Sequence, residues 1–211
     1  MSVTFWMDYV NGTFVIRIII VLVPTHVHQI WLQGGELPEP LRGYAKGVSD
    51  LCDRVGWQYS LWSVQDYKKL SSESQEVFRT LSAKCCHISQ QSNILRYLIL
   101  RDFGGLYLDV DVRLRKLPEA LDGAWAHKSF ASACPAGHPW ALRIVSMFNN
   151  IDLSKHATGG SRLVRMSMGP DVNVWPSGAW GRFEDTRAAL GTHGLLGLSI
   201  GSYKLPPVIV V

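Results

Sequence analysis

The sequence is poor in the features that mark several protein classes. It has only four cysteines among 211 residues, and none of them shows the Cys-x-x-Cys spacing of zinc ribbons and redox motifs. Charged residues make up 18% of the chain and apolar residues 47%, a balance that excludes a disordered segment. We therefore expect a folded chain whose cysteines are buried, reduced thiols; they are Cys52, Cys85, Cys86 and Cys134.

Long apolar runs are also missing. The most apolar stretch, residues 14–23, contains Arg17 and is half as long as the span of about 20 residues that a bilayer requires. It is followed by Pro24 and His26 and not by a small-residue cleavage site. We divide the chain into an apolar N-terminal segment, residues 1–23, which is either a strand or a residual anchor, and a single domain over residues 24–211. The compartment stays open: cytoplasmic or membrane-associated, and Golgi-type if the segment is an anchor.

Positive charge is in slight excess and unevenly placed. The formal net charge is +4. Residues 36–122 contain twelve acidic and twelve basic side chains, whereas residues 123–211 contain four acidic and eight basic ones. Because these bases do not cluster, the sequence argues against a nucleic-acid partner. A mildly basic second half suits an anionic small ligand or a membrane surface.

Hydrophobic periodicity predicts strands that alternate with helices. Patterns typical of strands cover residues 26–32, 57–63 and 106–112, and a last strand is expected at 208–211. Helical spacing covers residues 44–55, 64–70, 74–83, 89–103 and 144–148, with Gly104 as a left-handed cap. This order predicts an α/β fold with a mostly parallel central sheet flanked by helices. Ligands of such sheets bind at the carboxyl ends of the strands.

Two acidic residues stand at the end of the strand predicted at 106–112. Its strict alternation places Asp109 and Asp111 on one side of the strand. Neighbouring carboxylates repel each other unless a cation neutralises them, and their hard oxygens suit Mg²⁺ or Mn²⁺. An isolated Asp-x-Asp also occurs on solvated strand faces, and here Arg113 and Arg115 offer partners for that alternative.

The preceding twenty residues favour the ligand-binding interpretation. Asn93 and Arg96 are three residues apart and share a face of the predicted helix. The guanidinium of Arg96 is always charged and matches phosphate oxygens. Gly104 and Gly105 allow a tight return from the helix to the strand, which brings this face against the two carboxylates. An arginine, an amide and two carboxylates in one place predict a site for a nucleotide diphosphate and a divalent metal.

Three segments carry a resemblance to a known family: residues 28–31 (HQIW), 92–97 (SNILRY) and 104–111 (GGLYLDVD). With them the sequence resembles glycosyltransferases whose sugar-binding region contains a DXD motif. The family includes initiating α-1,6-mannosyltransferases, inositol-phosphoceramide mannosyltransferases, α-1,4-galactosyltransferases and capsular polysaccharide transferases, and it is related to the catalytic core of the clostridial glucosylating toxins. The resemblance is dense over residues 24–122. It implies a GT-A fold in which residues 24–122 form the donor-binding half and residues 123–211 the acceptor-side half.

The resemblance also implies a reaction. A hexose would pass, with retention of anomeric configuration, from a nucleotide sugar (UDP-glucose, UDP-galactose or GDP-mannose) to a glycan, lipid or protein acceptor, with Mn²⁺ or Mg²⁺ as cofactor. Asp109, Asp111 and Arg96 would carry the chemistry. The residues implied in donor binding are Gln29, Trp31, Asn93, Arg96, Tyr107, Asp109 and Val110. Asp109, Asp111, His193 and Ser202 would hold the metal.

Some of these roles have competing interpretations. Trp31 and Tyr107 also suit packed aromatic positions, and His193 suits an ordinary loop. Asn93 stands where the family commonly has aspartate, so a charge is lost beside the donor sugar. An amide can still bond a sugar hydroxyl. The alternative function is therefore a catalytically weak nucleotide-sugar-binding or glycan-binding module on the same fold.

Overall fold

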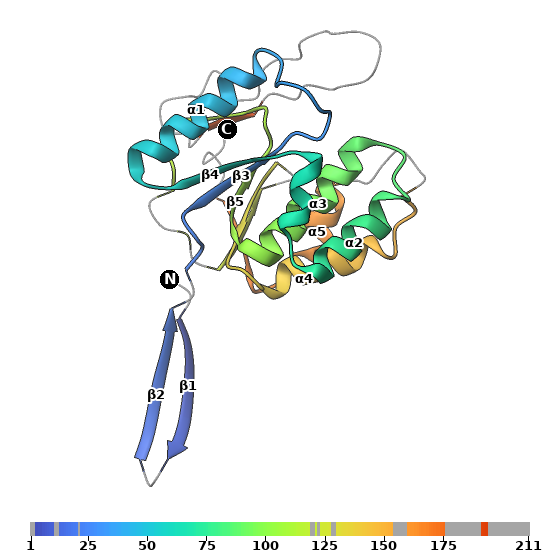
Figure 1. The fold of residues 1–211 in the computed structure, drawn as a ribbon. Coiled ribbons are helices and arrows are strands. Elements are labelled where there is room, and N and C mark those ends of the chain that lie inside the picture. Colours follow the sequence, from blue (N-terminus) through green and yellow to red (C-terminus); the bar gives the residue numbers. More distant parts are fainter. Residues whose placement is uncertain are drawn as a thin grey trace.

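The centre of the molecule is a six-stranded sheet. The computed structural model describes residues 3–10, 13–20, 22–118, 121, 123–127, 130–153, 160–175 and 191–193. The strand order is β4-β3-β5-β8-β7-β9 (Figure 1). These strands are β3 (His26–Ile30), β4 (Gln58–Trp62), β5 (Gly105–Leu108), β7 (Ala124–His127), β8 (Ala131–Cys134) and β9 (Val172–Val174). Only β8 runs antiparallel to its sheet neighbours, which confirms the prediction of a mostly parallel sheet.

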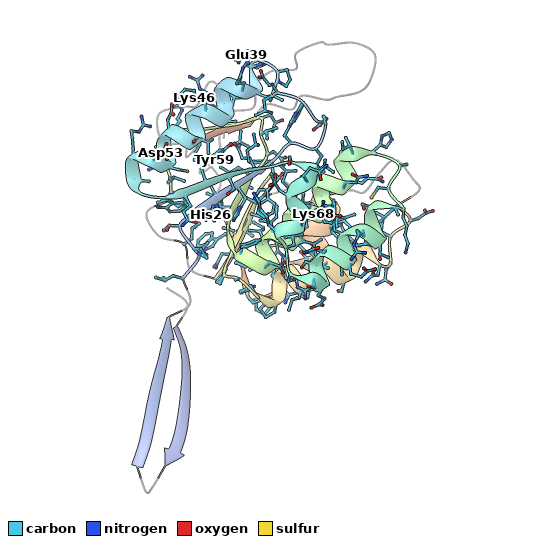
Figure 2. All side chains as sticks on the ribbon, in the orientation of Figure 1. His26, Glu39, Lys46, Asp53, Tyr59 and Lys68 are labelled. Carbon is cyan, nitrogen blue, oxygen red and sulfur yellow. The ribbon has the colours of Figure 1, made fainter. Side chains whose placement is uncertain are left out.

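Helices cover both faces of this sheet (Figure 1). The helix α1 (Leu41–Val55) packs on one face, where Val48 and Cys52 join an apolar cluster with Val27 and Leu106. Its charged residues Lys46 and Asp53 are exposed and lie on the outer side of α1 (Figure 2). The other face carries α2 (Ser72–Ser82), α3 (Ile88–Phe103), α4 (Pro139–Phe148) and α5 (Gly160–Ser167). The apolar stripe of α3 is fully buried there because the sheet and these helices enclose it.

The return from α3 to β5 depends on two glycines. Gly104 has φ +65° and ψ −155°, so the predicted left-handed cap is wrong in ψ although φ is positive. A Cβ on Gly104 would lie 2.5 Å from the Ala136 nitrogen, and one on Gly105 would lie 2.5 Å from the His26 carbonyl oxygen. Because a side chain at either position would clash with backbone atoms, only glycine allows the chain to pass directly from α3 into β5. Residues 64–70, expected as α-helix, form a 3-10 helix, η1 (Val64–Lys69).

The N-terminal residues form a separate hairpin. Strands β1 (Val3–Val10) and β2 (Thr13–Ile20) pair antiparallel and extend away from the rest of the chain (Figure 1). Across the described residues, no helix combines the length and apolarity needed to cross a bilayer. The domain boundary at residue 23 stays a prediction.

The sequence also predicted buried, reduced cysteines and a last strand at residues 208–211. All four cysteines are free, as expected, but only Cys52 and Cys134 are buried, whereas Cys86 is exposed. The strand expected at residues 208–211 lies outside the described residues. A second small sheet pairs β6 (Val112–Leu114) with β10 (Gly191–His193) in antiparallel register.

Candidate functional site

The two acidic residues lie in a turn and not on a strand. Strand β5 ends at Leu108, and the Val112 amide donates to the Asp109 carbonyl at 3.0 Å, which closes a turn around Val110 and Asp111. The predicted strand over 106–112 is therefore too long. The Asp109 amide still bonds the Phe130 carbonyl at 2.9 Å, so Asp109 is the last residue held by the neighbouring strand's end.

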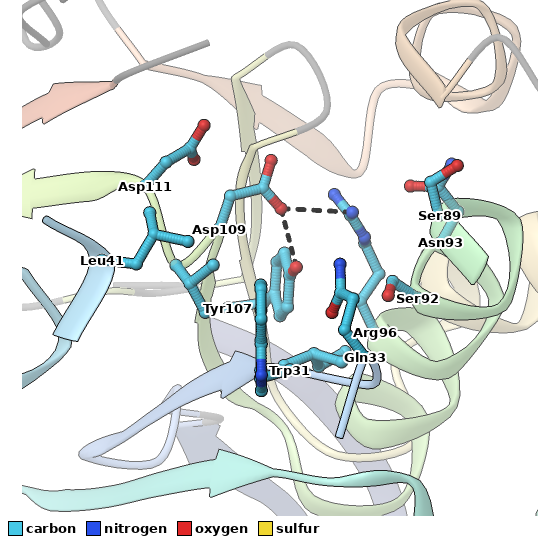
Figure 3. Close-up of a pocket in the computed structure, with 12 residues that line it drawn as sticks. Trp31, Gln33, Leu41, Ser89, Ser92, Asn93, Arg96, Tyr107, Asp109 and Asp111 are labelled. Atoms are coloured by element: carbon cyan, nitrogen blue, oxygen red, sulfur yellow. Dashed lines mark hydrogen bonds and ion pairs between the residues drawn. The ribbon is translucent and has the colours of Figure 1, made fainter. Parts of the chain in front are cut away.

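This turn forms one wall of a cleft of about 260 Å³ (Figure 3). The cleft lies between the ends of β3 and β5 and the first two turns of α3, at the carboxyl edge of the parallel strands, as the sequence predicts. Its lining residues are Ile30, Trp31, Gln33, Leu41, Ser89, Ser92, Asn93, Arg96, Tyr107, Asp109, Val110 and Asp111. Every residue predicted in donor binding lines this cleft except Gln29.

Arg96 is the buried cation of the site. Its side chain is 6% exposed, and its Nη2 lies 3.1 Å from Asp109 Oδ1. The guanidinium carbon lies 4.5 Å from the centroid of the Tyr107 ring, a cation–π contact. Burial by itself lowers the pKa of Arg96, but the charge of Asp109 and weaker contributions from Tyr107, Tyr97 and Asp111 raise it above the ordinary value. Arg96 therefore stays positively charged in the closed interior.

Tyr107 supports the same carboxylate from below. Its hydroxyl donates to Asp109 Oδ1 at 2.7 Å, and its side chain is buried. Burial raises the pKa of Tyr107 well above its ordinary value, against the opposing effect of Arg96. The hydroxyl therefore keeps its proton and acts as a donor. Asp109 Oδ1 accepts from two directions, which fixes the carboxylate in one orientation.

Both carboxylates are at the same end of the cleft, with the indole of Trp31 across from them (Figure 3). Carboxylate oxygens suit Mg²⁺ or Mn²⁺. Within the described part of the chain, no group of three or more His, Cys, Asp or Glu side chains is placed to hold a metal. The donor set nevertheless fits such an ion, because Mg²⁺ commonly takes one or two protein carboxylates and fills its other positions with substrate phosphate and water.

The backbone brings a third predicted metal ligand towards this turn. In the pairing of β10 with β6, His193 is opposite Val112, the residue directly after Asp111. Residues 112 and 193 are far apart in sequence, so only the fold brings them together. Ser202, the other predicted ligand, lies outside the described residues.

Sequence reasoning missed part of the lining. Ser89, Ser92 and Gln33 line the cleft without having been singled out. Ser92 and Arg96 follow Ser89 by three and seven residues along α3 and therefore share its face. The helical period that grouped Asn93 with Arg96 was thus a sufficient signal for both serines. No such signal exists for Gln33, which is in an irregular segment after β3.

Gln29 is in a different place from the one expected. It is fully buried beneath the turn. Its Nε2 donates to the Asp109 carbonyl at 3.1 Å, and its Oε1 accepts from the Tyr59 hydroxyl at 2.9 Å. Its amide is thus engaged by the protein itself, and Gln29 is not among the residues that line the cleft.

The architecture is that of a GT-A glycosyltransferase, as the sequence predicts. Among solved structures, the chain is similar to one described as PaToxG Glycosyltransferase, with a TM-score of 0.54 over 70% of this chain and 69% of that one. The sequence identity is 14%, so this similarity shows the fold alone.

Sequence matches point to the same class of protein. Residues 38–131 match the model of a family described as the glycosyltransferase sugar-binding region containing DXD motif. The chain is 26% identical over 175 residues to inositol phosphoceramide mannosyltransferase 3 of Schizosaccharomyces pombe, which covers 79% of this chain and 48% of that protein. It is 31% identical over 99 residues to uncharacterized glycosyltransferase L373 of Acanthamoeba polyphaga mimivirus, covering 45% of this chain and 38% of that protein. The chain thus spans about half the length, or less, of each of these two relatives.

Proposed function

We propose that the chain binds a nucleotide sugar in this cleft and, as a metal-dependent retaining glycosyltransferase, transfers the hexose to an acceptor. One observation carries the proposal: Asp109, Asp111 and the buried cation Arg96 converge on a single cleft whose opposite wall is Trp31. Two carboxylates suit a metal, the guanidinium suits a diphosphate, and the indole suits a nucleobase.

The donor is positioned by three parts of the cleft. The indole Nε1 of Trp31 donates to the Gly34 carbonyl at 3.3 Å, which holds the ring in place for stacking on the base. Asn93 and Ser92, on the first turns of α3, offer amide and hydroxyl groups to sugar hydroxyls. Arg96 supplies a fixed positive charge beside the diphosphate, and Asp109 keeps the guanidinium oriented.

Asp111 and Asp109 would hold Mn²⁺ or Mg²⁺, with His193 and Ser202 as further ligands. When bound, such an ion offsets the negative charge that develops on the departing nucleotide diphosphate. Arg96, which pairs with Asp109, would add a fixed positive charge that acts in the same direction. Retention requires the acceptor hydroxyl to approach from the face on which the diphosphate leaves, which is the face next to these groups.

The relatives indicate a substrate class. Three of them are named inositol phosphoceramide mannosyltransferases. Mannose is therefore the favoured sugar and GDP-mannose the favoured donor over UDP-glucose and UDP-galactose, and a lipid is the favoured acceptor over a glycan or a protein. A lipid acceptor would place the enzyme at a membrane surface.

The test combines binding and turnover. We expect Mn²⁺ together with GDP or UDP to raise the melting temperature more than either alone, because a ligand specific for the folded state stabilises it. We expect hydrolysis or transfer of the matching nucleotide sugar to require Mn²⁺ or Mg²⁺. Asp111→Ala should remove this metal-dependent turnover while the protein stays folded.

Asp50→Ala is the matched control, since Asp50 is an exposed aspartate on α1 that pairs only with Lys46 among the interactions described for it. It should leave turnover unchanged. Full activity of Asp111→Ala would refute the proposed function.

Asn93 is the observation that favours the alternative, a binding module with weak catalysis, because the cleft lacks the carboxylate usual at this position. Binding of the nucleotide sugar with no turnover across donors and acceptors would support the module. In that case Asn93→Asp, which restores the carboxylate, is the variant expected to gain turnover.

A further inference from the structure

Gln29 is a polar residue in an apolar layer. It is on β3 on the same face as Val27, the face on which α1 packs, and both residues are 0% exposed. Burying an amide among apolar groups costs free energy unless its donor and acceptor are both satisfied. Gln29 therefore needs a structural or functional reason to be there.

Both ends of the Gln29 amide have partners. Oε1 accepts from the Tyr59 hydroxyl at 2.9 Å, and Nε2 donates to the Asp109 carbonyl at 3.1 Å. Tyr59 is on the neighbouring strand β4 and packs against the same apolar cluster. Burial raises the pKa of Tyr59 above its ordinary value, so its hydroxyl stays protonated and donates. Because Oε1 accepts this bond, the amide is oriented with its NH₂ group towards Asp109.

The backbone amide and the backbone carbonyl of Asp109 are consequently both hydrogen-bonded. Its carbonyl accepts from the Val112 amide at 3.0 Å and from Gln29, and its amide donates to the Phe130 carbonyl at 2.9 Å. The bond to Val112 closes the turn that contains Asp111. Gln29 adds the one side-chain donor described for this carbonyl and ties the turn to β3.

We propose that Gln29 and Tyr59 are a positioning pair: they hold the Asp109 carbonyl and so fix the turn that aims the Asp109 and Asp111 carboxylates at the metal and the diphosphate. This inference rests on the proposed function. It replaces the sequence-based role of Gln29 as a donor contact. Partners that orient metal ligands from behind are commonly worth about 10–100-fold in metal affinity. Since this pair acts through the backbone, we expect an effect near the lower end.

The experiment compares three variants. Gln29→Met keeps the volume but removes both hydrogen bonds, and Tyr59→Phe removes only the hydroxyl that orients the amide. Val27→Ala is the control, because it creates a cavity on the same face of the same strand and removes no hydrogen bond to Asp109. Two quantities are measured: the hydrogen-exchange rate of the Val112 amide in metal-free protein, and the affinity for Mn²⁺ in the presence of GDP or UDP, followed by electron paramagnetic resonance of free Mn²⁺.

Gln29→Met should speed exchange at Val112 and weaken Mn²⁺ binding about 10-fold. Tyr59→Phe should change both in the same direction by a smaller factor. Val27→Ala should lower the melting temperature at least as much as Tyr59→Phe. It should leave the Mn²⁺ affinity unchanged and should not speed exchange at the Val112 amide more than at the neighbouring amides.

Two results would overturn the pair. One is a Gln29→Met or Tyr59→Phe variant whose Val112 exchange and Mn²⁺ affinity match those of Val27→Ala. The other is weaker nucleotide binding without Mn²⁺ and unchanged Mn²⁺ affinity, which would make Gln29 a direct donor contact. If the unmodified protein binds no Mn²⁺, the proposed function fails, whereas exchange at Val112 still decides whether Gln29 holds the turn.

Discussion

His28 and Gln29 are consecutive, fully buried and polar, yet they hold opposite ends of β5. His28 is on the α3 face, where its Nδ1 accepts from Trp62 Nε1 at 3.1 Å and its Nε2 donates to the Gly104 carbonyl at 3.1 Å. Gln29 is on the α1 face and bonds the Asp109 carbonyl. His28 thus holds the start of β5 (its entrance), and Gln29 holds the end of β5 (its exit). Only the exit adjoins the cleft, so equal burial predicts unequal consequences: stability at one end, ligand binding at the other.

The largest expected effect is at the entrance. In Gly105→Ala the new Cβ would meet the His26 carbonyl at 2.5 Å and His28 Nε2 at 3.0 Å, at φ +95°. Backbone on one side and a fixed ring on the other leave no room for relaxation, so we expect a loss of about 3 kcal/mol or more in the free energy of unfolding. Urea denaturation measures it.

Gly56→Ala is the control for this change. Gly56 has φ +73°, but a Cβ added there would have no atom within 4 Å. It should lose only about 1 kcal/mol, the cost of the backbone conformation. Equal losses in the two variants would show that the close approach at Gly105 contributes nothing.

The next effect is a pH dependence that originates from His28. Burial, helped by the charge of His26 and opposed by the bond to Gly104, lowers the pKa of His28 to about 3, against 6.5 in the unfolded chain. Below pH 6.5 the unfolded chain binds a proton that the folded one does not, so stability falls as the pH falls. The contribution between pH 7 and pH 5 is about 2 kcal/mol.

His28→Gln isolates this contribution. The variant should be less stable at pH 7 and should lose less stability than the unmodified protein between pH 7 and pH 5. Chemical denaturation at a series of pH values gives both numbers. Parallel curves for the two proteins would mean that His28 does not titrate on unfolding.

The smallest expected effect on stability is at the exit. Tyr107→Phe removes the hydroxyl that donates to Asp109 Oδ1 at 2.7 Å but keeps the ring beneath Arg96. We expect a loss of about 1.5 kcal/mol in stability, the low end of the range for a hydrogen bond to a charged group. We also expect a several-fold weaker affinity for Mn²⁺ with GDP or UDP, because Asp109 loses a partner that orients its carboxylate.

Calorimetry of Mn²⁺ and nucleotide binding checks the second part. A variant with unchanged affinity would place Tyr107 with His28, as a residue that serves folding only. A variant with weakened affinity and nearly native stability would sharpen the difference between the two ends of β5.

The helical part of the site was predictable because its signal is local. The spacing of Asn93 and Arg96 on a strongly periodic segment placed both on the face of α3 that lines the cleft. The glycine pair correctly predicted the tight return to the sheet. The alternating pattern of residues 106–112, by contrast, gave no sign that the strand stops at Leu108, since a turn closed by the Val112 amide leaves the pattern of residue types unchanged.

The contacts of Gln29 could not be predicted from the sequence either. Alternation along β3 places it opposite His28 but does not say which face meets the cleft, and its partners Tyr59 and Asp109 are thirty and eighty residues away. A hydrogen bond across that separation leaves no periodic trace in one sequence.

The sequence by itself determined the α/β class, the long helix with its polar face, and the group of an arginine, an amide and two carboxylates, because each depends on neighbours within about twenty residues. The tertiary structure alone decided where β5 ends, that Arg96 pairs with Asp109 in the wall of the cleft, and that His193 pairs with the residue after Asp111. These features depend on strands that are distant in the chain and meet only when the sheet assembles.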